Sequence, residues 1–330
     1  MQGKTNSFKI TAIKLNPAKW KRTVMDSGVR NARYLILGRE LNRGLLFKLF
    51  LYWILIITSY IYLNPVLKML VKMVMNHRDL VNPAVTWIPR ELYWGHLAKA
   101  WNALQYGRTL FISIAVSGLS AFFHVITCGM MGYALARMQF RLKKLLFFLL
   151  IMAFIIPPQV TILPLIMMYT ELGFQNHLVS ILIPSIFGFG VKGALFVIIY
   201  RQFFMTQPKE LEEAAKIDGA SAFRFYWKVM FPLAKPAILV VSIFSFVWTW
   251  NDTYFPSMFL SGANDVPLAL QMSRLDTSIK AMLTKEDAPE VMIESIKMAA
   301  SFLVILPPLV IFFLVQRFFV ESVERAGLVE

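Results

Sequence analysis

The chain of 330 residues is 57% hydrophobic and only 16% charged, whereas soluble domains average about 45–50% apolar and about 25% charged residues. This composition excludes an ordinary soluble globular protein and predicts an integral membrane protein. The single cysteine excludes a disulfide framework and a thiolate metal centre. The net charge of +15 would suit nucleic acid, but the basic residues lie where they would orient membrane helices, so nucleic-acid binding is poorly supported.

Residues 1–48 form a basic tail that precedes the first long apolar stretch. Basic residues near an anionic bilayer surface contribute about 1 kcal/mol each, so this tail would suit membrane lipid. A disordered cytoplasmic extension is an equal interpretation, and the sequence leaves the two open.

Six apolar stretches are long enough to cross a membrane, which takes about 20 residues in a helix. Helices are favoured because backbone groups in lipid must find partners within their own segment. We therefore predict an all-α integral membrane protein with six transmembrane helices, a membrane domain over 49–320 and a C-terminal tail over 321–330. The predicted helices are 49–67, 109–136, 145–170, 178–200, 236–260 and 298–316.

The distribution of basic residues predicts the orientation of these helices. The link 137–144 has four basic residues and no acid, and the link 201–235 has six basic residues. The positive-inside rule therefore places both links and both termini in the cytoplasm. The loop 68–108 also has six basic residues, although the same orientation places it outside.

Prolines and glycines interrupt three of the six predicted helices. Broken helices are tolerated where they line a water-filled cavity, and they are common in transporters. Ordinary kinked packing explains any single break equally well, but breaks in three helices favour a moving pathway. The residues concerned are Pro157, Pro158, Pro164, Pro184, Gly188, Gly190, Gly193, Pro307 and Pro308.

The link after the fourth predicted helix is longer than a connection requires. Pro208 suits a first helical position, and Gly219 suits a left-handed helix cap. Ser221 can cap a second short helix, which we expect Pro232 to end. The pattern predicts a helix–turn–helix element over 208–231 that docks a partner protein, with a solvated connecting loop as the alternative.

Ionisable residues at membrane depth are candidate functional groups. Asp252 lies in the fifth predicted helix, among aromatic and amide side chains that suit the rings and hydroxyls of sugars. An interfacial aromatic belt is the alternative. Lys192, in the fourth helix, could pair with Asp252, meet an acidic sugar or contact a partner helix. We do not expect the pairing, because the estimated depths of the two residues differ by about 10 Å at 1.5 Å per residue. The predicted pathway residues are Trp248, Trp250, Asn251, Asp252, Tyr254 and Lys192.

The string "ELEEAAKIDGASAFRFYWKVMFPLAKP" (210–236) resembles the EAA loop of ABC-importer permeases. The strings "GYALARMQF" (132–140), "ELGFQNH" (171–177) and "WTWNDTYFP" (248–256) are similar to the carbohydrate, maltose-type branch of that family. The resemblance implies a type I permease fold whose loop sits in a groove of an ATPase subunit. It implies a basic partner for Glu213 and a bend at Gly219. The implied coupling residues are Glu213, Ala214, Ala215, Asp218, Gly219 and Pro232.

The resemblance further implies one permease subunit of an ATP-driven bacterial importer of a sugar or oligosaccharide. Its partners would be a second homologous permease, two ATPase subunits, an extracellular solute-binding protein and membrane lipid. We expect no enzyme activity, cofactor or metal in this chain, because it has no complete P-loop or metal motif; ATP and magnesium would be bound by the ATPase. An ion-coupled secondary transporter and a non-transporting membrane scaffold remain as alternatives.

Overall fold

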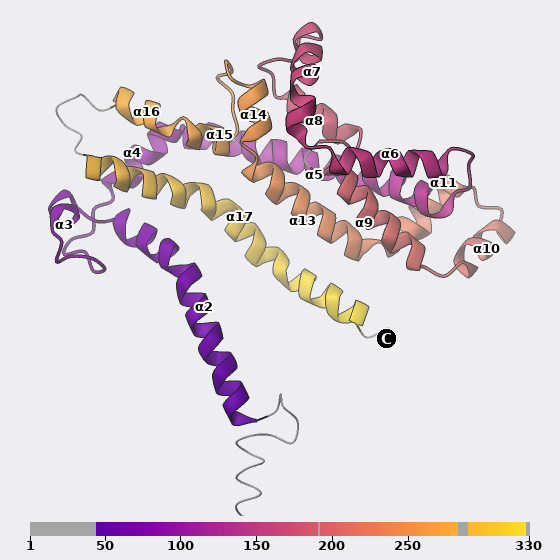
Figure 1. The fold of residues 1–330 in the computed structure, drawn as a ribbon, viewed down its shortest axis with the longest axis horizontal. Coiled ribbons are helices and arrows are strands. Elements are labelled where there is room, and N and C mark those ends of the chain that lie inside the picture. Colours follow the sequence, from indigo (N-terminus) through magenta and orange to yellow (C-terminus); the bar gives the residue numbers. More distant parts are fainter. Residues whose placement is uncertain (1–43, 191, 283–289, 328–330) are drawn as a thin grey trace, which may run out of the picture. The chain divides into compact units, whose positions relative to one another are not determined.

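The computed structural model describes residues 44–190, 192–282 and 290–327 (Figure 1). These residues are predominantly helical and form no named strand, so the predicted all-α class is confirmed. The chain divides into two units, 1–68 and 69–330. Most of the basic tail lies outside the described residues.

The first candidate span is α2, Leu45–Lys72, which contains the predicted stretch 49–67 and is longer at both ends. Its 28 residues are apolar on every side and include Pro65. Nearly all of its large side chains are exposed within this chain, and Met69 is its one buried residue. A helix that is hydrophobic all round is expected in a membrane or in the interior of a larger assembly.

The second unit is built around α5, Tyr106–Arg137, the longest of its central helices. It packs against α8 (Val179–Ile186), α9 (Gly193–Thr206) and α13 (Lys235–Asn251). The close approach of α5 and α9 depends on Gly132, where an added Cβ would lie 2.5 Å from Cβ of Tyr200. The last helix, α17 (Glu290–Gly327), packs on α13.

Sharp breaks alter three of the predicted spans, but the interruption predicted at Pro307 and Pro308 is wrong, because α17 continues through both prolines. The stretch 145–170 forms α6 (Lys143–Ile155) and α7 (Pro158–Glu171), bent by 99° where two prolines interrupt the helix. The stretch 178–200 is split into α8 and α9. The prediction of one helix over 236–260 is wrong, because α13 ends at Asn251 and the short α14 (Tyr254–Phe259) follows.

Length and composition identify three spanning helices among the described residues, or five if each bent pair counts as one span. The halves of the 178–200 stretch are too short to pass that test separately. The protein is therefore a multi-pass membrane protein, while the count of six spans remains a prediction.

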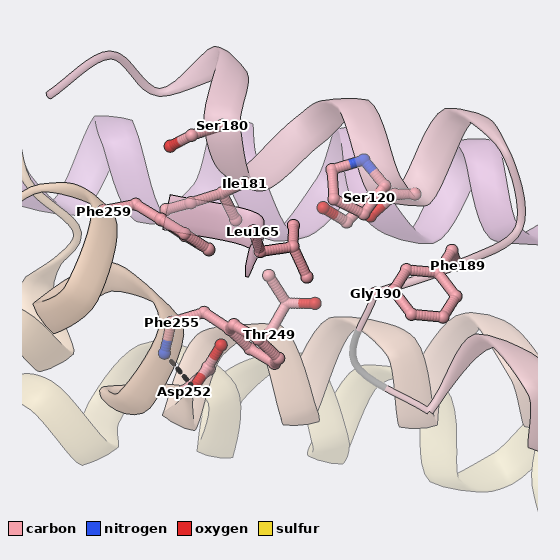
Figure 2. A pocket seen from close by; sticks show the side chains of 12 residues that line it. Ser120, Leu165, Ser180, Ile181, Phe189, Gly190, Thr249, Asp252, Phe255 and Phe259 are labelled. Carbon is pink, nitrogen blue, oxygen red and sulfur yellow. Dashed lines mark hydrogen bonds between the residues drawn. The ribbon is translucent and has the colours of Figure 1, made fainter. Parts of the chain in front are cut away.

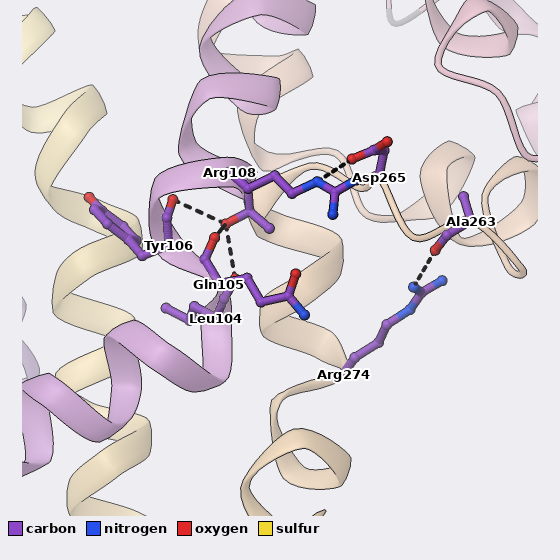
Figure 3. A network of polar contacts seen from close by, with 8 residues as sticks. Leu104, Gln105, Tyr106, Arg108, Ala263, Asp265 and Arg274 are labelled. Atoms are coloured by element: carbon purple, nitrogen blue, oxygen red, sulfur yellow. Dashed lines mark hydrogen bonds and ion pairs between the residues drawn. The ribbon is translucent and has the colours of Figure 1, made fainter. Parts of the chain in front are cut away.

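Short elements occupy both ends of the second unit. Arg108 at one end donates from Nε to Oδ1 of Asp265 at 2.5 Å, and Arg274 donates to the carbonyl of Ala263 at 3.2 Å (Figure 3). The first contact joins the start of α5 to the segment before α15, and the second joins the end of α15 to that same segment. The short elements are α3 His77–Val81, α4 Gly95–Leu104, α10 Glu210–Ile217, α11 Ala222–Phe225, a π-helix Tyr226–Met230, α12 Phe231–Leu233, α15 Leu268–Ser273 and α16 Leu275–Met282.

Two main buried clusters hold the second unit together. One joins α4, α16 and α17 and includes Leu104, Leu275 and Trp250. The other joins α5, α9 and the π-helix and includes Phe204 and Tyr226. Full burial of a large apolar side chain contributes about 1.5–3 kcal/mol, so these clusters fix the helices on which the candidate site residues lie.

Candidate functional site

The predicted docking element is present as two short helices with a tight turn between them. α10 begins at Glu210, two residues after the predicted start, and has three glutamates in its first turn. Negative charge there interacts favourably with the positive end of the helix dipole. Lys216 lies one turn after Glu212, and its Nζ is 2.9 Å from Oε1 of that residue. α10 has no buried residue.

Gly219 makes the turn possible. Its φ is +70°, a left-handed conformation that side chains with a Cβ rarely adopt. Its N–H donates to the carbonyl of Lys216 at 3.1 Å, and the N–H of Ala220 donates to the carbonyl of Ala215 at 2.9 Å. These two bonds form a Schellman motif, and they confirm the predicted left-handed cap.

Ser221 caps the second helix as predicted, because its Oγ accepts a hydrogen bond from the N–H of Arg224 at 3.3 Å. The prediction that Pro232 ends this helix is wrong. Pro232 lies in the first turn of α12, where a missing N–H costs little. The helical path continues into α13 through a 77° bend. The turn before the proline is a π-helix, in which the N–H of Phe231 bonds to the carbonyl of Tyr226.

The docking element is tied firmly to the helices behind it. Tyr226 and Met230 are buried against α5 and α9. Arg137, at the end of α5, donates to the carbonyl of Phe204 at 2.9 Å and also to the carbonyl of Gln207. The element therefore packs in one buried cluster with residues of α5, α9 and α13.

The residues singled out from the EAA loop differ in exposure. Glu213, Ala214 and Asp218 are exposed, as are Gly219 and Pro232, whereas Ala215 is half-buried against the core. Glu213 forms no ion pair with any residue that the structure describes. It lines a polar cavity of about 380 Å³ together with Arg137 and Lys143.

Sequence reasoning missed two exposed apolar side chains on this polar element. Ile217 is 87% exposed and Phe223 is 64% exposed. Both flank the Gly219 turn, and neither has a place in the core of this chain. The sequence does contain a signal for this exposure, because an apolar residue beside a helix cap in an otherwise charged segment indicates a contact surface.

The predicted pathway begins at the break between α8 and α9. Gly188 and Gly190 have φ of +67° and +96°, and Lys192 has φ of +61° at the start of α9. An added Cβ on Gly193 would lie 2.3 Å from the carbonyl oxygen of Gly188. Glycine is therefore required where the two half-helices meet.

α5 supplies partners for backbone groups that the break exposes. Thr127 donates from Oγ1 to the carbonyl of Ile186 at 2.8 Å. Nε2 of His124 lies 2.8 Å from the carbonyl of Phe189, and its Nδ1 lies 2.7 Å from Oγ of Ser245. A carbonyl can only accept, so Nε2 carries the proton and Nδ1 accepts from the serine hydroxyl. One buried imidazole thus joins α5, the break and α13.

Asp252 lies at the end of α13 beside a small cavity (Figure 2). Its Oδ1 accepts hydrogen bonds from the N–H groups of Tyr254 at 2.9 Å and Phe255 at 3.4 Å. Its Oδ2 is buried and has no hydrogen-bond partner among the residues that the structure describes, and the same is true of Oγ of Ser120. The cavity is about 30 Å³, enough for one or two water molecules. Its other polar lining residues are Ser180, Ser185 and Thr249.

Lys192 is exposed and lines a neighbouring cavity of about 280 Å³. The two cavities share Leu165, Phe189, Gly190 and Phe255 as lining residues. No ion pair between Lys192 and Asp252 occurs in the described part of the chain.

The remaining predicted pathway residues do not gather around Asp252. Trp248 stacks on Phe196 with ring centroids 5.6 Å apart. Trp250 is buried in the cluster that joins α4, α16 and α17, and its ring stacks on that of Phe246. Asn251 is exposed and bonds to the backbone of its own helix, and Tyr254 packs on the adjacent Phe255. Of the six predicted residues, Asp252 and Lys192 line these two cavities.

Comparison with known proteins gives consistent results. Residues 126–325 match the family described as "Binding-protein-dependent transport system inner membrane component". The sn-glycerol-3-phosphate transport system permease protein UgpE of Yersinia enterocolitica is 28% identical over 289 residues, which cover 86% of this chain and 97% of that protein. The melibiose/raffinose/stachyose import permease protein MelC of Bacillus subtilis is 32% identical over 244 residues, covering 73% and 83%.

A solved structure has the same fold. It is a bacterial ABC transporter involved in the import of the acidic polysaccharide alginate, and one of its chains matches with a TM-score of 0.71 at 20% sequence identity. The match covers 83% of this chain and 96% of the other.

Proposed function

Because this chain belongs to the family of binding-protein-dependent transport system inner membrane components, we propose that it is a permease subunit of an ATP-driven importer of a sugar or related polyol. The family match over 126–325 carries this proposal. The named substrates of UgpE and MelC, a phosphorylated polyol and oligosaccharides, support the substrate class. The second permease, the two ATPase subunits and the binding protein would be separate chains, and ATP would be hydrolysed on the ATPase.

The docking element over 208–231 would connect this permease to the ATPase in the cytoplasm. Exposed Ile217 and Phe223 would enter an apolar groove of the partner, and the unpaired carboxylate of Glu213 would meet a basic residue there. Such a contact combines a buried apolar anchor with a charged pair that fixes how the two proteins are aligned. Tyr226, packed against α5 and α9, would carry the ATPase stroke into these helices, which the bonds of Arg137 join at their ends.

The substrate pathway would run beside the break between α8 and α9. Asp252 offers an acceptor without a partner, and Lys192 offers a cation in the adjoining cavity. The cavity beside Asp252 has room for only one or two water molecules, so it would have to widen during transport. Movement of the half-helices around the glycines of the break would supply that widening.

The coupling role is tested with the complete transporter in liposomes, with ATPase and binding protein present. We expect Glu213→Ala and Gly219→Val each to abolish ATP hydrolysis stimulated by the loaded binding protein, because one removes the charge and the other strains the turn. Membrane insertion should be unchanged. Glu210→Ala is the matched control, since it removes an exposed glutamate from the same helix and should keep most of the stimulation.

Normal stimulation in both coupling variants would contradict the docking role. Uptake that survives inactivation of the ATPase and follows an ion gradient would instead support a secondary transporter. A chain that recruits a partner and supports no uptake would be a scaffold.

A further inference from the structure

A second exposed apolar surface lies in the loop between α2 and α4. We call residues 76–94 the aromatic loop. Trp87 and Trp94 are exposed, and Ile88 is 83% exposed. Monomeric soluble proteins rarely display such a concentration of large apolar side chains. The exposed apolar residues of the loop are Val81, Trp87, Ile88, Leu92, Tyr93 and Trp94.

The aromatic loop is held in a defined conformation. Asp79 is buried, its N–H donates to Oδ1 of Asn76 at 2.8 Å, and its Oδ2 accepts from the N–H of Arg90 at 2.8 Å. The N–H of Tyr93 donates to the carbonyl of Val74 at 2.8 Å. A backbone bond between the two ends of the loop, and a buried carboxylate that joins its first turn to Arg90, therefore hold the loop in a conformation that leaves the apolar side chains exposed.

The chemistry of the loop matches a bilayer interface. Tryptophan and tyrosine are enriched where hydrocarbon meets headgroups, because their rings are apolar and their N–H or O–H remains hydrated. Exposed Arg78 and Arg90 suit lipid phosphates, and Glu91 is the exposed acid among them. The loop also follows a candidate span directly and lies at the end of the second unit opposite α10 (Figure 1).

We propose that the aromatic loop inserts its apolar side chains into the lipid leaflet at that end of the molecule and anchors the protein there. This contact also gives a reason for the basic residues of 68–108, which the positive-inside rule leaves unexplained. The proposal concerns lipid alone and does not depend on which solute is carried.

The test uses the full chain in lipid nanodiscs with one environment-sensitive fluorophore. The single native cysteine is first removed by Cys128→Ala. In this background, Ile88→Cys introduces one cysteine in the loop, which is labelled with a nitrobenzoxadiazole group. Ile217→Cys is the matched control, because Ile217 is equally exposed but lies on α10. Leu92→Cys provides a second position in the loop if the first variant does not fold.

The fluorophore at Ile88 should show blue-shifted emission, strong quenching by lipids spin-labelled near the headgroup and weak quenching by iodide. The fluorophore at Ile217 should show the reverse. Quenching at Ile88 should strengthen when phosphatidylglycerol replaces phosphatidylcholine. A water-like signal at both loop positions would overturn the proposal. So would shielding that develops only when a binding protein is added, because the surface would then dock a protein.

Discussion

At the scale of single residues, the buried polar side chains of His124 and Asp252 differ in their hydrogen bonding. His124 has a partner on each ring nitrogen. Within the described part of the chain, Asp252 has one buried oxygen without a hydrogen-bond partner, and it lines a cavity. A buried polar atom without a partner is costly, so its presence beside a cavity favours a role in binding.

Asp252 and Lys192 should therefore influence which solute is transported. We expect Asp252→Asn to weaken uptake of a neutral sugar, because the amide replaces one acceptor oxygen with a donor. Lys192→Gln should reduce uptake of an anionic solute more than that of a neutral one. Asn251→Ala is the control, since its side chain bonds to its own helix. Unchanged rate and preference in both charge variants would make these residues part of the packing only. The measurement is binding-protein-dependent uptake of competing solutes.

His96 predicts a pH dependence of stability outside the spanning helices. It is 1% exposed, beside the ring of Tyr93, and its Nε2 bonds to the carbonyl of Met75 at 3.1 Å. Burial lowers its pKa below 6.5, with a smaller opposing effect of that hydrogen bond and a further lowering by Lys99. The unfolded state therefore binds more protons near pH 6, so the free energy of unfolding should fall as pH drops below about 6.5.

The measurement is the thermal unfolding midpoint in detergent at neutral and mildly acidic pH. His96→Gln removes the titrating group and should flatten the dependence while retaining a donor for Met75. An equal acid sensitivity in wild type and variant would contradict this assignment.

At the scale of elements, the break between α8 and α9 is held by α5. Thr127 and His124 bond to its carbonyls, and Sγ of Cys128 lies 3.6 Å from the carbonyl of Gly193. Non-helical backbone at membrane depth persists only where such partners exist. The glycines of this break and the Gly219 turn follow from sequence, because positive φ values favour glycine. The side chains that hold the break could not be predicted, since they come from a helix about 60 residues away.

Removing the imidazole should loosen this break. His124→Leu leaves a buried carbonyl and a serine hydroxyl unpaired, which costs about 1–3 kcal/mol each. We expect a lower unfolding midpoint and faster maleimide labelling of Cys128, which is fully buried in the native fold. His124→Gln offers one donor and one acceptor and should restore much of both. Slow labelling in the leucine variant would show that the break is held without this residue.

At the scale of the whole molecule, composition determined the membrane class. The lengths and positions of the apolar stretches determined where most helices lie. The turn at Gly219 and the cap at Ser221 were also determined locally, because they depend on backbone conformation and on neighbours a few residues away. Only the tertiary structure decided that Pro232 continues a helix, that the aromatic residues near Asp252 separate, and that Ile217 and Ile88 remain exposed. These features depend on contacts between distant segments, which a pattern of neighbouring residues does not encode.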